Sequence, residues 1–330
     1  MRSPTQPELE AGDIAALVRE ALGARTAVDE ARELTGGTFA GVWLVTLSDG
    51  QGIVVKVGPP PGARLLRYER GLIAAEASYF RLVRAAAPGV PVPEVLHEGD
   101  GWLVTTLLPG RTLADLAGAG PPSGDAAVRA ELGAAVAALH RVTGDRFGYS
   151  GDRPSAPTWP AAFAAMVGDL LDDAAAWDVP LPAGAPDIRD LIADRHAELA
   201  SVTRPALLHF DLWDGNVLAA PDAAGRLRLS GIVDGERFLY GDPLLDLVSP
   251  ALFRRIEEEP GHPFLRGYAR ATGRDVPLDA SARTRLALYR AHLYLVMLAE
   301  GPSRGLAGDT DRHDQVSALL RAELDVVRRA

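Results

Sequence analysis

The alternation of apolar and polar residues near the beginning of the chain predicts a small β-rich unit. Residues 34–57 contain AGVWLVTLS, the turn SDGQG and GIVVKVG, which predict a strand, a tight turn and a second strand. The segment 102–110, WLVTTLLPG, predicts another strand that ends at Pro109 and Gly110. The intervening APGVPVPEVL is interrupted by prolines and is expected to be extended.

Apolar residues at helical spacing predict helices before and after these strands. A short helix is expected over 13–22, and a longer one over 68–86 has an apolar stripe that includes Leu72, Tyr79 and Val83. Beyond this region the pattern is mainly helical, and 281–299 is apolar enough for a buried helix. The other predicted elements are helices over 125–141, 161–177 and 187–200, and a loop at GAGPPSGD that is too short to link two domains.

The composition is that of a soluble globular protein. The chain has 330 residues, enough for two lobes, with 47% apolar and 24% charged residues. It contains no cysteine, which excludes disulfides and cysteine-bound metals and fits a reducing cytoplasm. No stretch has the apolar run that a signal peptide or a membrane-spanning helix needs. We therefore expect a cytoplasmic protein without a membrane partner.

The net charge of −10 limits the classes of partner. A strongly acidic chain is a poor nucleic-acid binder, because the phosphate backbone repels it. The same charge would suit a cationic small molecule. Glu257, Glu258 and Glu259 form an acidic run, which we expect to be solvated; the alternative is that it attracts a polyamine.

Only one of the 34 basic residues is a lysine, and all the others are arginines. Lys56 lies in GIVVKVG, the second predicted strand. Lysine is a compact point charge and arginine a planar fork, so the two do not replace each other freely at a phosphate site. Kinases use a lysine on such a strand to hold the α- and β-phosphates of the nucleotide. We expect this role for Lys56; the alternative is a lysine retained by chance on a surface strand.

A carboxylate within an apolar helical stripe needs a partner. Glu76 lies within the stripe of the helix over 68–86, and Lys56 is its natural partner, since kinases pair a strand lysine with a helix glutamate. Glu69 lies two turns earlier on a similar face and is the rival. We favour Glu76, which could otherwise be a solvated residue at the edge of the stripe.

Two motifs in the second half of the chain carry the strongest chemical signal. Residues 209–216 read HFDLWDGN, with Asp211 five positions before Asn216, and residues 231–236 read GIVDGE, with Asp234 after an apolar strand. This is the spacing of a kinase catalytic loop and its metal site. Asp211 would orient or accept the proton of an attacking hydroxyl, whereas Asn216 and Asp234 would give oxygen ligands to Mg²⁺. Each residue alone could belong to a capped turn.

Residues around these motifs are expected to support them. We predict that His209 braces the loop by hydrogen bonding and that Gly235 relaxes the backbone at the metal-binding turn. Asp242 precedes a proline and is expected to cap a helix. Together with Asp246 it either braces the loops or helps to shape the site. His140, at the end of a predicted helix, is expected to be structural.

Two further segments are candidates for nucleotide contacts. Gly36 and Gly37 lie in LTGGTFAG, where backbone N–H groups could approach phosphates; the alternative is an ordinary hairpin turn. The strand over 102–110 leads into the position of a kinase hinge. Backbone groups near Thr106 and Leu108 are therefore expected to hydrogen-bond adenine.

The motifs HFDLWDGN, IVDGERFLYGDPLLDL and VVKV, with the Glu76 helix before GVPVPEVL, resemble those of the aminoglycoside phosphotransferase and fructosamine kinase family. They cover most of residues 34–250. The resemblance implies a two-lobed, protein-kinase-like α+β fold, with a small β-rich lobe over 1–107 and a large mainly helical lobe over 108–330. It also implies transfer of the ATP γ-phosphate, with Mg²⁺, to a hydroxyl of a small molecule. Family acceptors include aminoglycosides, other antibiotics, fructosamines, choline, homoserine and sugars.

The form H-x-D-L-W-x-x-N, with Trp213, resembles the fructosamine kinase branch, although Phe210 stands where that branch usually has glycine. Gly235 replaces an aromatic residue that the family often has after the second metal-binding aspartate. Acceptor specificity in the family lies largely in the helical insert, around 155–200 here, and in the region after residue 250.

We therefore expect a small-molecule kinase of the antibiotic phosphotransferase type, with a fructosamine or other sugar or amino-alcohol kinase as the alternative. A protein kinase is disfavoured, because the chain lacks H-R-D, D-F-G and A-P-E. A pseudokinase or binding module would be expected to lack at least one of the key residues. Lys56, Asp211, Asn216 and Asp234 are all present.

Overall fold

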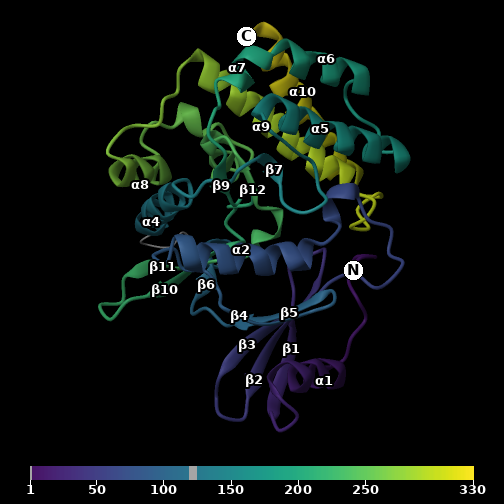
Figure 1. Ribbon diagram of the computed structural model, residues 1–330, viewed down its shortest axis with the longest axis vertical. Helices are drawn as coiled ribbons and strands as arrows, with labels where there is room; N and C mark the ends of the chain where they lie inside the picture. The colour runs from purple at the N-terminus through teal and green to yellow at the C-terminus, as the bar shows by residue number, and fades with distance from the viewer. Residues whose placement is uncertain (1, 119–124) are drawn as a thin grey trace.

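The computed structural model describes residues 2–118 and 125–330. Figure 1 shows a β-sheet at one end of the long axis and a group of helices at the other, which confirms the predicted α+β class. We call the elements up to strand β5 the N-terminal lobe and those from strand β6 onward the C-terminal lobe. The loop predicted at GAGPPSGD falls mainly at 119–124 and lies outside the described residues.

The N-terminal lobe is built on an antiparallel sheet of five strands in the order β1-β2-β3-β5-β4. Buried and partly exposed residues alternate along β2, as expected for a strand with one face on a core. Helix α1 (Ala11–Leu22) covers this face, where Ile14 and Val18 pack against Trp43 and Trp102. The strands are β1 (Val28–Leu34), β2 (Gly41–Leu47), β3 (Gly52–Val57), β4 (Val95–Gly99) and β5 (Trp102–Thr106).

Strand β1 is absent from the sequence prediction. Its residues, VDEAREL, are mostly polar, and none is fully buried, because β1 lies at the edge of the sheet. Its pairing with β2, from Val28–Leu47 to Leu34–Val42, supplies the hydrogen bonds. A strand that depends on its neighbour in this way leaves little side-chain pattern to detect.

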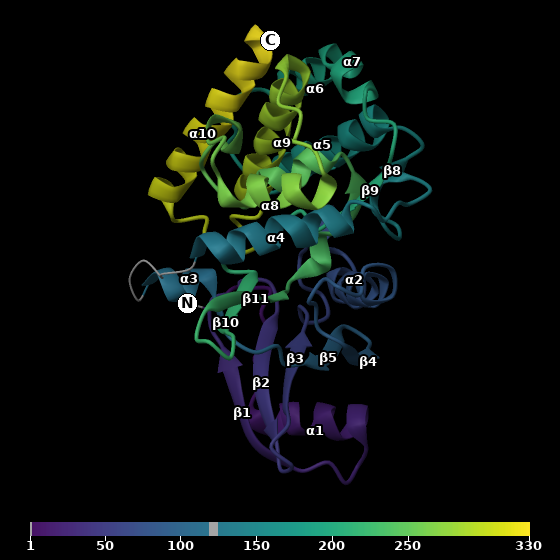
Figure 2. The same cartoon turned by 90° about the vertical axis from the view of Figure 1, so that its left-hand side faces the viewer.

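Helix α2 (Leu72–Ala86) lies between the sheet and the C-terminal lobe (Figure 2). The helix predicted over 68–86 is wrong at its beginning, where the 3-10 helix η1 (Arg67–Glu69) precedes it. Gly71 separates the two with φ of +72°, a left-handed conformation that interrupts a right-handed helix. The apolar side chains of α2 join a core cluster that continues into the C-terminal lobe.

Helix α9 (Ala280–Ala299) is at the centre of the C-terminal lobe, and most of its side chains are buried between α5 and α10. The helix predicted over 187–200 is divided at Arg195 into α6 and α7, and α3, α8 and α10 were not predicted. None of the described helices is long and apolar enough to cross a membrane. The other helices are α3 (Leu113–Gly118), α4 (Asp125–Leu139), α5 (Trp159–Ala176), α6 (Ala185–Asp194), α7 (His196–Ala200), α8 (Pro263–Thr272) and α10 (Thr310–Arg329).

Two small sheets, ordered β11-β10-β6 and β8-β7-β12-β9, carry the segments with the predicted motifs. The loop 209–216 joins β9 to β10, and 233–236 follows β11. The strands are β6 (Arg111–Thr112), β7 (Phe147–Tyr149), β8 (Ser155–Ala156), β9 (Ala206–Leu208), β10 (Val217–Pro221), β11 (Leu227–Ile232) and β12 (Leu239–Gly241). Between and after them are the 3-10 helices η2 (Gly235–Arg237), η3 (Pro243–Leu247) and η4 (Ile256–Glu258).

Helices α4 and α8 approach each other closely because a glycine stands at each contact. A Cβ atom on Gly267 would lie 1.8 Å from the carbonyl oxygen of Ala130, and one on Gly133 would lie 2.1 Å from the carbonyl oxygen of Phe264. Interiors are packed at van der Waals distance, so no larger residue fits either position without moving a helix.

We expect Gly267→Ala to push α8 away from α4 and to lower the free energy of unfolding by about 2 kcal/mol or more. The matched control is Gly12→Ala in α1, where no atom in the described part of the chain lies within 4 Å of the added Cβ. This control should be neutral or slightly stabilising, because alanine favours helices. Urea denaturation measures both variants, and equal stabilities would contradict the packing argument.

Candidate active site

The loop 209–216 brings Asp211 and Asn216 together at one end of the β10–β11 hairpin. The side-chain Nδ2 of Asn216 donates to the carbonyl oxygen of Asp211 at 2.9 Å. The N–H of Val233 donates to the carbonyl oxygen of Asn216 at 3.0 Å. Because Val233 directly precedes Asp234, the residues of both motifs lie side by side.

A fully buried carboxylate holds the beginning of this loop. Asp246 accepts the main-chain N–H groups of His209 at 3.0 Å and Phe210 at 2.6 Å, and it lies 3.1 Å from Nε2 of His140. A buried carboxylate is tolerated when such partners satisfy it. Asp246 therefore braces the loop, and His140 has the structural place expected from the sequence.

His209 braces the same loop with its ring. Nδ1 accepts the N–H of Asp211 at 3.2 Å, and Nε2 donates to the carbonyl oxygen of Val233 at 3.0 Å, which assigns the proton to Nε2. Burial lowers the pKa of His209, so the ring stays neutral. Asp242 has its expected capping position as well, since it accepts the N–H of Leu244 at 3.1 Å.

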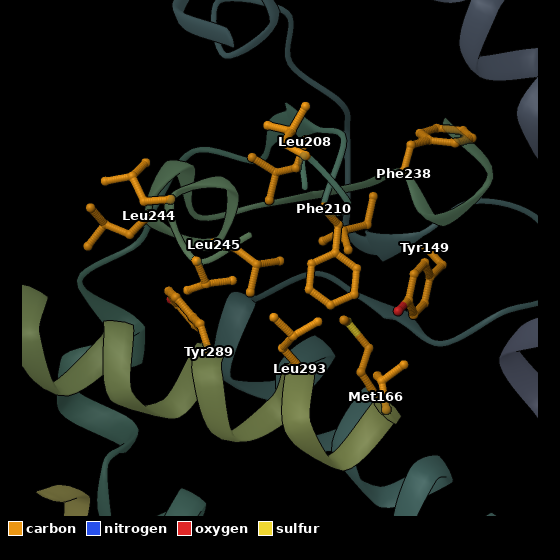
Figure 3. Packing of buried hydrophobic residues seen from close by; sticks show 14 of the residues in the cluster. Tyr149, Met166, Leu208, Phe210, Phe238, Leu244, Leu245, Tyr289 and Leu293 are labelled. Atoms are coloured by element: carbon orange, nitrogen blue, oxygen red, sulfur yellow. The ribbon is translucent and has the colours of Figure 1, made fainter. Parts of the chain in front are cut away.

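Phe210 has a backbone conformation that residues other than glycine rarely adopt. Its φ is +71°, which costs roughly 1–2 kcal/mol in the left-handed region. The buried ring stacks on His292 at 5.4 Å and lies near Leu293 and Met166 in the core of the C-terminal lobe (Figure 3). This packing offsets the backbone strain at a position where the fructosamine kinase branch usually has glycine.

The ammonium group of Lys56 on β3 is enclosed by three carboxylates. Nζ lies 2.8 Å from Oε2 of Glu76, 2.5 Å from Oδ1 of Asp234 and 2.7 Å from Oε2 of Glu236. Lys56, Glu76 and Glu236 are buried, whereas the side chain of Asp234 is 41% exposed. The cluster therefore joins β3, α2 and the segment after β11, with one carboxylate partly open to solvent.

Glu69, the rival partner considered for Lys56, lies elsewhere. It is buried in η1 and pairs with Arg304 of the C-terminal lobe at 2.6 Å. The structure thus contains the Lys56–Glu76 ion pair that the sequence analysis favoured. Glu76 is buried, so the alternative of a solvated glutamate is wrong.

Burial and charge act in opposite directions on this cluster. Burial alone would lower the pKa of Lys56, but Asp234, Glu236 and Glu76 raise it well above its usual value. Burial raises the pKa of Glu76 to about 7 despite the charge of Lys56. Burial alone would also raise the pKa of Asp234, whereas Lys56 lowers it below its usual value. Lys56 therefore stays protonated, and Asp234 remains a carboxylate anion at neutral pH.

The three carboxylates form a candidate metal site. One oxygen each from Glu76, Asp234 and Glu236 lies within 4.8 Å of the others. They outnumber the single ammonium group and so attract a further cation, and carboxylate oxygens are ligands that Mg²⁺ prefers. The sequence analysis missed Glu236, although a carboxylate two positions after Asp234 was a visible signal. The predicted ligand Asn216 lies beside this group, at the neighbouring strand end.

Gly235 is needed for space rather than for backbone freedom, which corrects the sequence prediction. The positive φ of +65° belongs to Asp234, not to Gly235. A Cβ atom at Gly235 would lie 2.0 Å from the ring of Tyr79 on α2. This buried ring, 5.3 Å from that of His209, fills the space that a side chain after Asp234 would need.

Arg237 was not predicted as a site residue, and an arginine at this position carries no distinct sequence signal. Its Nη1 lies 3.6 Å from Oδ2 of Asp211, and its Nη2 lies 2.7 Å from Oε1 of Glu300. Burial alone would lower the pKa of Arg237, but Asp211 and Glu236 raise it. The guanidinium group is thus a permanent cation next to the carboxylate of Asp211.

The two segments predicted to contact a nucleotide both lie at the sheet of the N-terminal lobe. Gly36 and Gly37 are in the β1–β2 loop, and Leu108 follows β5. The N–H of Thr106 already donates to the carbonyl oxygen of Glu94 at 3.0 Å. The N–H of Thr106 is therefore not available to adenine, and a contact of the remaining backbone groups with adenine stays a prediction.

The acidic run after η3 is not uniformly solvated, so that prediction is wrong for Glu257. Glu257 is buried and accepts two hydrogen bonds from Arg290, at 2.9 and 2.7 Å. Glu258 is exposed and Glu259 partly exposed. The reason is α9, which places Arg290 in the interior, where a guanidinium group needs a carboxylate.

Comparison with known families identifies the class of the protein. The profile of the phosphotransferase enzyme family matches residues 30–289, which is most of the chain. The chain therefore belongs to the phosphotransferase enzyme family. A comparison with curated proteins finds no match.

Solved structures with the same fold include several phosphotransferases. A protein assigned as a fructosamine-3-kinase from Thermobifida fusca YX-ER1 has a TM-score of 0.71 at 23% identity, with 97% of this chain and 100% of that chain covered. Macrolide 2'-phosphotransferase type I has a TM-score of 0.61 at 19% identity, covering 96% and 98%. The streptomycin–ATP complex of APH(2")-IIa has a TM-score of 0.59 at 17% identity, covering 97% and 99%. These similarities establish the kinase-like fold.

His292 of α9 supports the loop through its stack on Phe210, and its ring faces an apolar cavity of about 10 Å³. Among the described residues, neither of its ring nitrogens has a hydrogen-bond partner. Burial, reinforced by Arg237, lowers the pKa of His292 to about 3. The folded state therefore binds fewer protons than the unfolded state between pH 3 and about 6.5.

We expect the free energy of unfolding to fall as the pH drops below about 6.5, with His292 contributing about 1.4 kcal/mol per pH unit. His292→Leu should reduce this dependence, and His313→Leu, on the outer helix α10, should not. Urea denaturation at pH 5 and pH 7 gives the comparison. An unchanged pH dependence in His292→Leu would show that this ring can be protonated in the folded state.

Proposed function

We propose that this phosphotransferase is an ATP- and Mg²⁺-dependent kinase that transfers the γ-phosphate to a hydroxyl of a small molecule. The observation that carries the proposal is a pair of salt bridges from Nζ of Lys56, to Oε2 of Glu76 at 2.8 Å and to Oδ1 of Asp234 at 2.5 Å. A cation and two carboxylates, which would serve the phosphates and a metal ion, thus lie next to the loop of Asp211. Phosphoryl transfer needs this arrangement, because it depends on positioning and on neutralising the phosphate charge.

Asp211 is the proposed base. The oxygen of the acceptor hydroxyl forms a bond to the γ-phosphorus, and the bond from that phosphorus to the bridging oxygen of ADP breaks. The hydroxyl proton passes to a carboxylate oxygen of Asp211. Arg237, at 3.6 Å from Oδ2, would hold that oxygen and leave Oδ1 for the acceptor.

Lys56 and the metal ligands would hold the triphosphate. Lys56 would bind oxygens of the α- and β-phosphates, with its ammonium group steadied by Glu76. Asp234, Glu236 and Asn216 offer the oxygen donors that fit Mg²⁺. Bound Mg²⁺ would neutralise charge on the phosphate oxygens.

The nucleotide would lie between the lobes, which we propose to divide as 1–107 and 108–330. Backbone N–H groups of Gly36 and Gly37 would approach the phosphates. The main chain from Thr106 to Leu108 would contact adenine, with Leu108 as the N–H donor, since the N–H of Thr106 is already bonded.

We propose an acceptor of the antibiotic phosphotransferase type, with a cationic molecule favoured by the net charge of −10. APH(2")-IIa, which shares the fold, binds streptomycin. A fructosamine or other sugar or amino-alcohol kinase is the second candidate, and Trp213 supports it. This residue of the H-x-D-L-W-x-x-N motif is 38% exposed on the catalytic loop, where it could contact an acceptor.

Phosphate transfer from Mg²⁺-ATP to a panel of acceptors tests the proposal, with the product identified by mass spectrometry. The panel contains aminoglycosides, macrolides, peptide antibiotics, fructosamines, sugars and amino alcohols. Phosphorylation of an antibiotic supports a resistance role, and phosphorylation of a fructosamine or sugar supports a metabolic one. Failure to bind or hydrolyse Mg²⁺-ATP, with no transfer to any acceptor, would reject the kinase in favour of a binding module. Chelation of Mg²⁺ by EDTA should abolish transfer.

We expect Asp211→Asn to lower kcat about 100-fold or more while nucleotide binding stays nearly unchanged, because the base is lost and the phosphate site is kept. Asp222→Asn, in the β10–β11 turn, is the matched control and should retain activity. Steady-state kinetics and nucleotide titration measure the two effects. Substantial transfer by Asp211→Asn would remove Asp211 from the role of base.

Lys56→Arg should lower kcat/KM at least about tenfold although the charge is kept. A planar guanidinium group cannot occupy the space that three carboxylates form around a compact ammonium group. The reciprocal control is Arg226→Lys, at a side chain that is 72% exposed, and it should be silent. Equal kcat/KM values for Lys56→Arg and the unmodified protein would contradict the argument from the single lysine.

A further inference from the structure

A segment before α1 lies against the glycine-rich loop between β1 and β2. We call residues 2–7 the leading segment. The side-chain amide of Gln6 donates to the carbonyl oxygen of Gly37 at 3.1 Å, and the hydroxyl of Thr5 donates to the carbonyl oxygen of Thr38 at 3.0 Å. Thr5 is only 1% exposed, so its contact belongs to the folded interior, whereas the contact of Gln6 lies at the surface.

The tip of the glycine-rich loop has few restraints of its own. Gly36 has φ of +116°, and no atom of the described residues lies within 4 Å of an ideal Cβ position at Gly36 or Gly37. Segments with few packed side chains open easily unless main-chain hydrogen bonds hold them. The leading segment supplies such bonds.

The leading segment also contacts the turn after α9, in the C-terminal lobe. The hydroxyl of Ser3 donates to the carbonyl oxygen of Ser303 at 3.2 Å, and Nη1 of Arg304 lies 3.5 Å from Oγ1 of Thr5. The guanidinium group of Arg304 lies over the ring of Phe39, 4.8 Å from its centre. Arg304 therefore reaches the glycine-rich loop through both Thr5 and Phe39.

Arg304 also belongs to a row of charges that ends at Asp211. Its Nη2 lies 2.6 Å from Glu69 and 3.4 Å from Oε1 of Glu300. The same oxygen of Glu300 accepts from Arg237 at 2.7 Å, and Arg237 lies 3.6 Å from Asp211. The charges alternate in sign from Glu69 through Arg304, Glu300 and Arg237 to Asp211.

Burial gives this row a preferred arrangement. Arg304 and Glu300 are 5% and 8% exposed, and Glu69 is 1% exposed. Displacing Arg304 would leave the buried carboxylate of Glu69 without its ion-pair partner and Glu300 with Arg237 alone, which is more costly than breaking a surface ion pair. A movement of the glycine-rich loop that shifted Arg304 would therefore also disturb Arg237.

We propose that Arg304 is a positioning residue that couples the glycine-rich loop to the Arg237–Asp211 pair, and that the leading segment links this loop to the C-terminal lobe. The assignment of nucleotide and base to the two ends rests on the proposed function. The leading segment keeps the glycine-rich loop near the phosphates. At the same time, the row of charges keeps the carboxylate of Asp211 oriented.

The test compares variants at Thr5, on the side of the glycine-rich loop, at Glu300, on the side of Asp211, and at Arg304 between them. Thr5→Val removes the hydroxyl at nearly constant shape and should raise the KM for ATP about fivefold with a smaller effect on kcat. Glu300→Gln should lower kcat about tenfold with little effect on that KM. Arg304→Lys should both raise the KM for ATP and lower kcat. Thr5→Ser, which restores the hydroxyl, should behave like the unmodified protein.

Amide hydrogen exchange over residues 34–41 provides a readout that does not depend on activity. Exchange should be several-fold faster in Thr5→Val and Arg304→Lys than in the unmodified protein. The matched control is Arg290→Lys on α9. It perturbs the buried ion pair of Arg290 with Glu257 at 2.7 Å, away from the leading segment. It should lower Tm without changing exchange in the loop or the kinetic constants.

The proposal fails if Arg304→Lys matches Arg290→Lys in both loop exchange and kinetics, because its effect would then be that of any broken buried pair. It also fails if Thr5→Val leaves loop exchange unchanged. If the unmodified protein transfers no phosphate, the proposed function fails instead. In that event faster exchange in Arg304→Lys would still support the claim that Arg304 and the leading segment hold the glycine-rich loop, and unchanged exchange would reject it.

Discussion

The ammonium group of Lys56, held among three carboxylates, is the interaction on which the site and the contact between the lobes depend. Its partners come from α2 and from the segment after β11, so one buried charge joins the two lobes. Removing such a charge from water is offset only while its partners remain within a few ångströms. The cluster also has more carboxylates than ammonium groups. Under the proposed function, the same cluster that links the lobes would also hold a metal ion and phosphates.

Around this cluster, buried groups set the geometry of the loop 209–216, which contains Asp211. Asp246 holds the main chain at His209 and Phe210, and Phe210 keeps a strained backbone because its ring is packed on His292. Among the described residues, the tip of the glycine-rich loop at Gly36 and Gly37 has no comparable packing of its own. Its position depends on contacts from the leading segment and from Arg304, which lie far from it in the sequence.

Much of the fold was predictable, because most of its elements have a local pattern. The helices α4, α5 and α9 begin and end close to their predicted limits, since their apolar residues recur at helical spacing. Strand β1 was missed because its stability comes from the backbone of β2 rather than from its own polar side chains. Glu257 looked solvated because nothing near it in the sequence announces its pairing with Arg290.

The sequence by itself determined the kind of chemistry, because Lys56, Asp211, Asn216 and Asp234 have functional groups and spacings that few other functions require. Only the tertiary structure decided that Glu236 joins the Lys56 cluster, that Arg237 faces Asp211, and that the ring of Tyr79 requires glycine after Asp234. The physical reason is the separation along the chain of the residues that each property involves. Spacing along a strand or loop is a local property, whereas the partner of a buried charge is chosen by packing between distant segments.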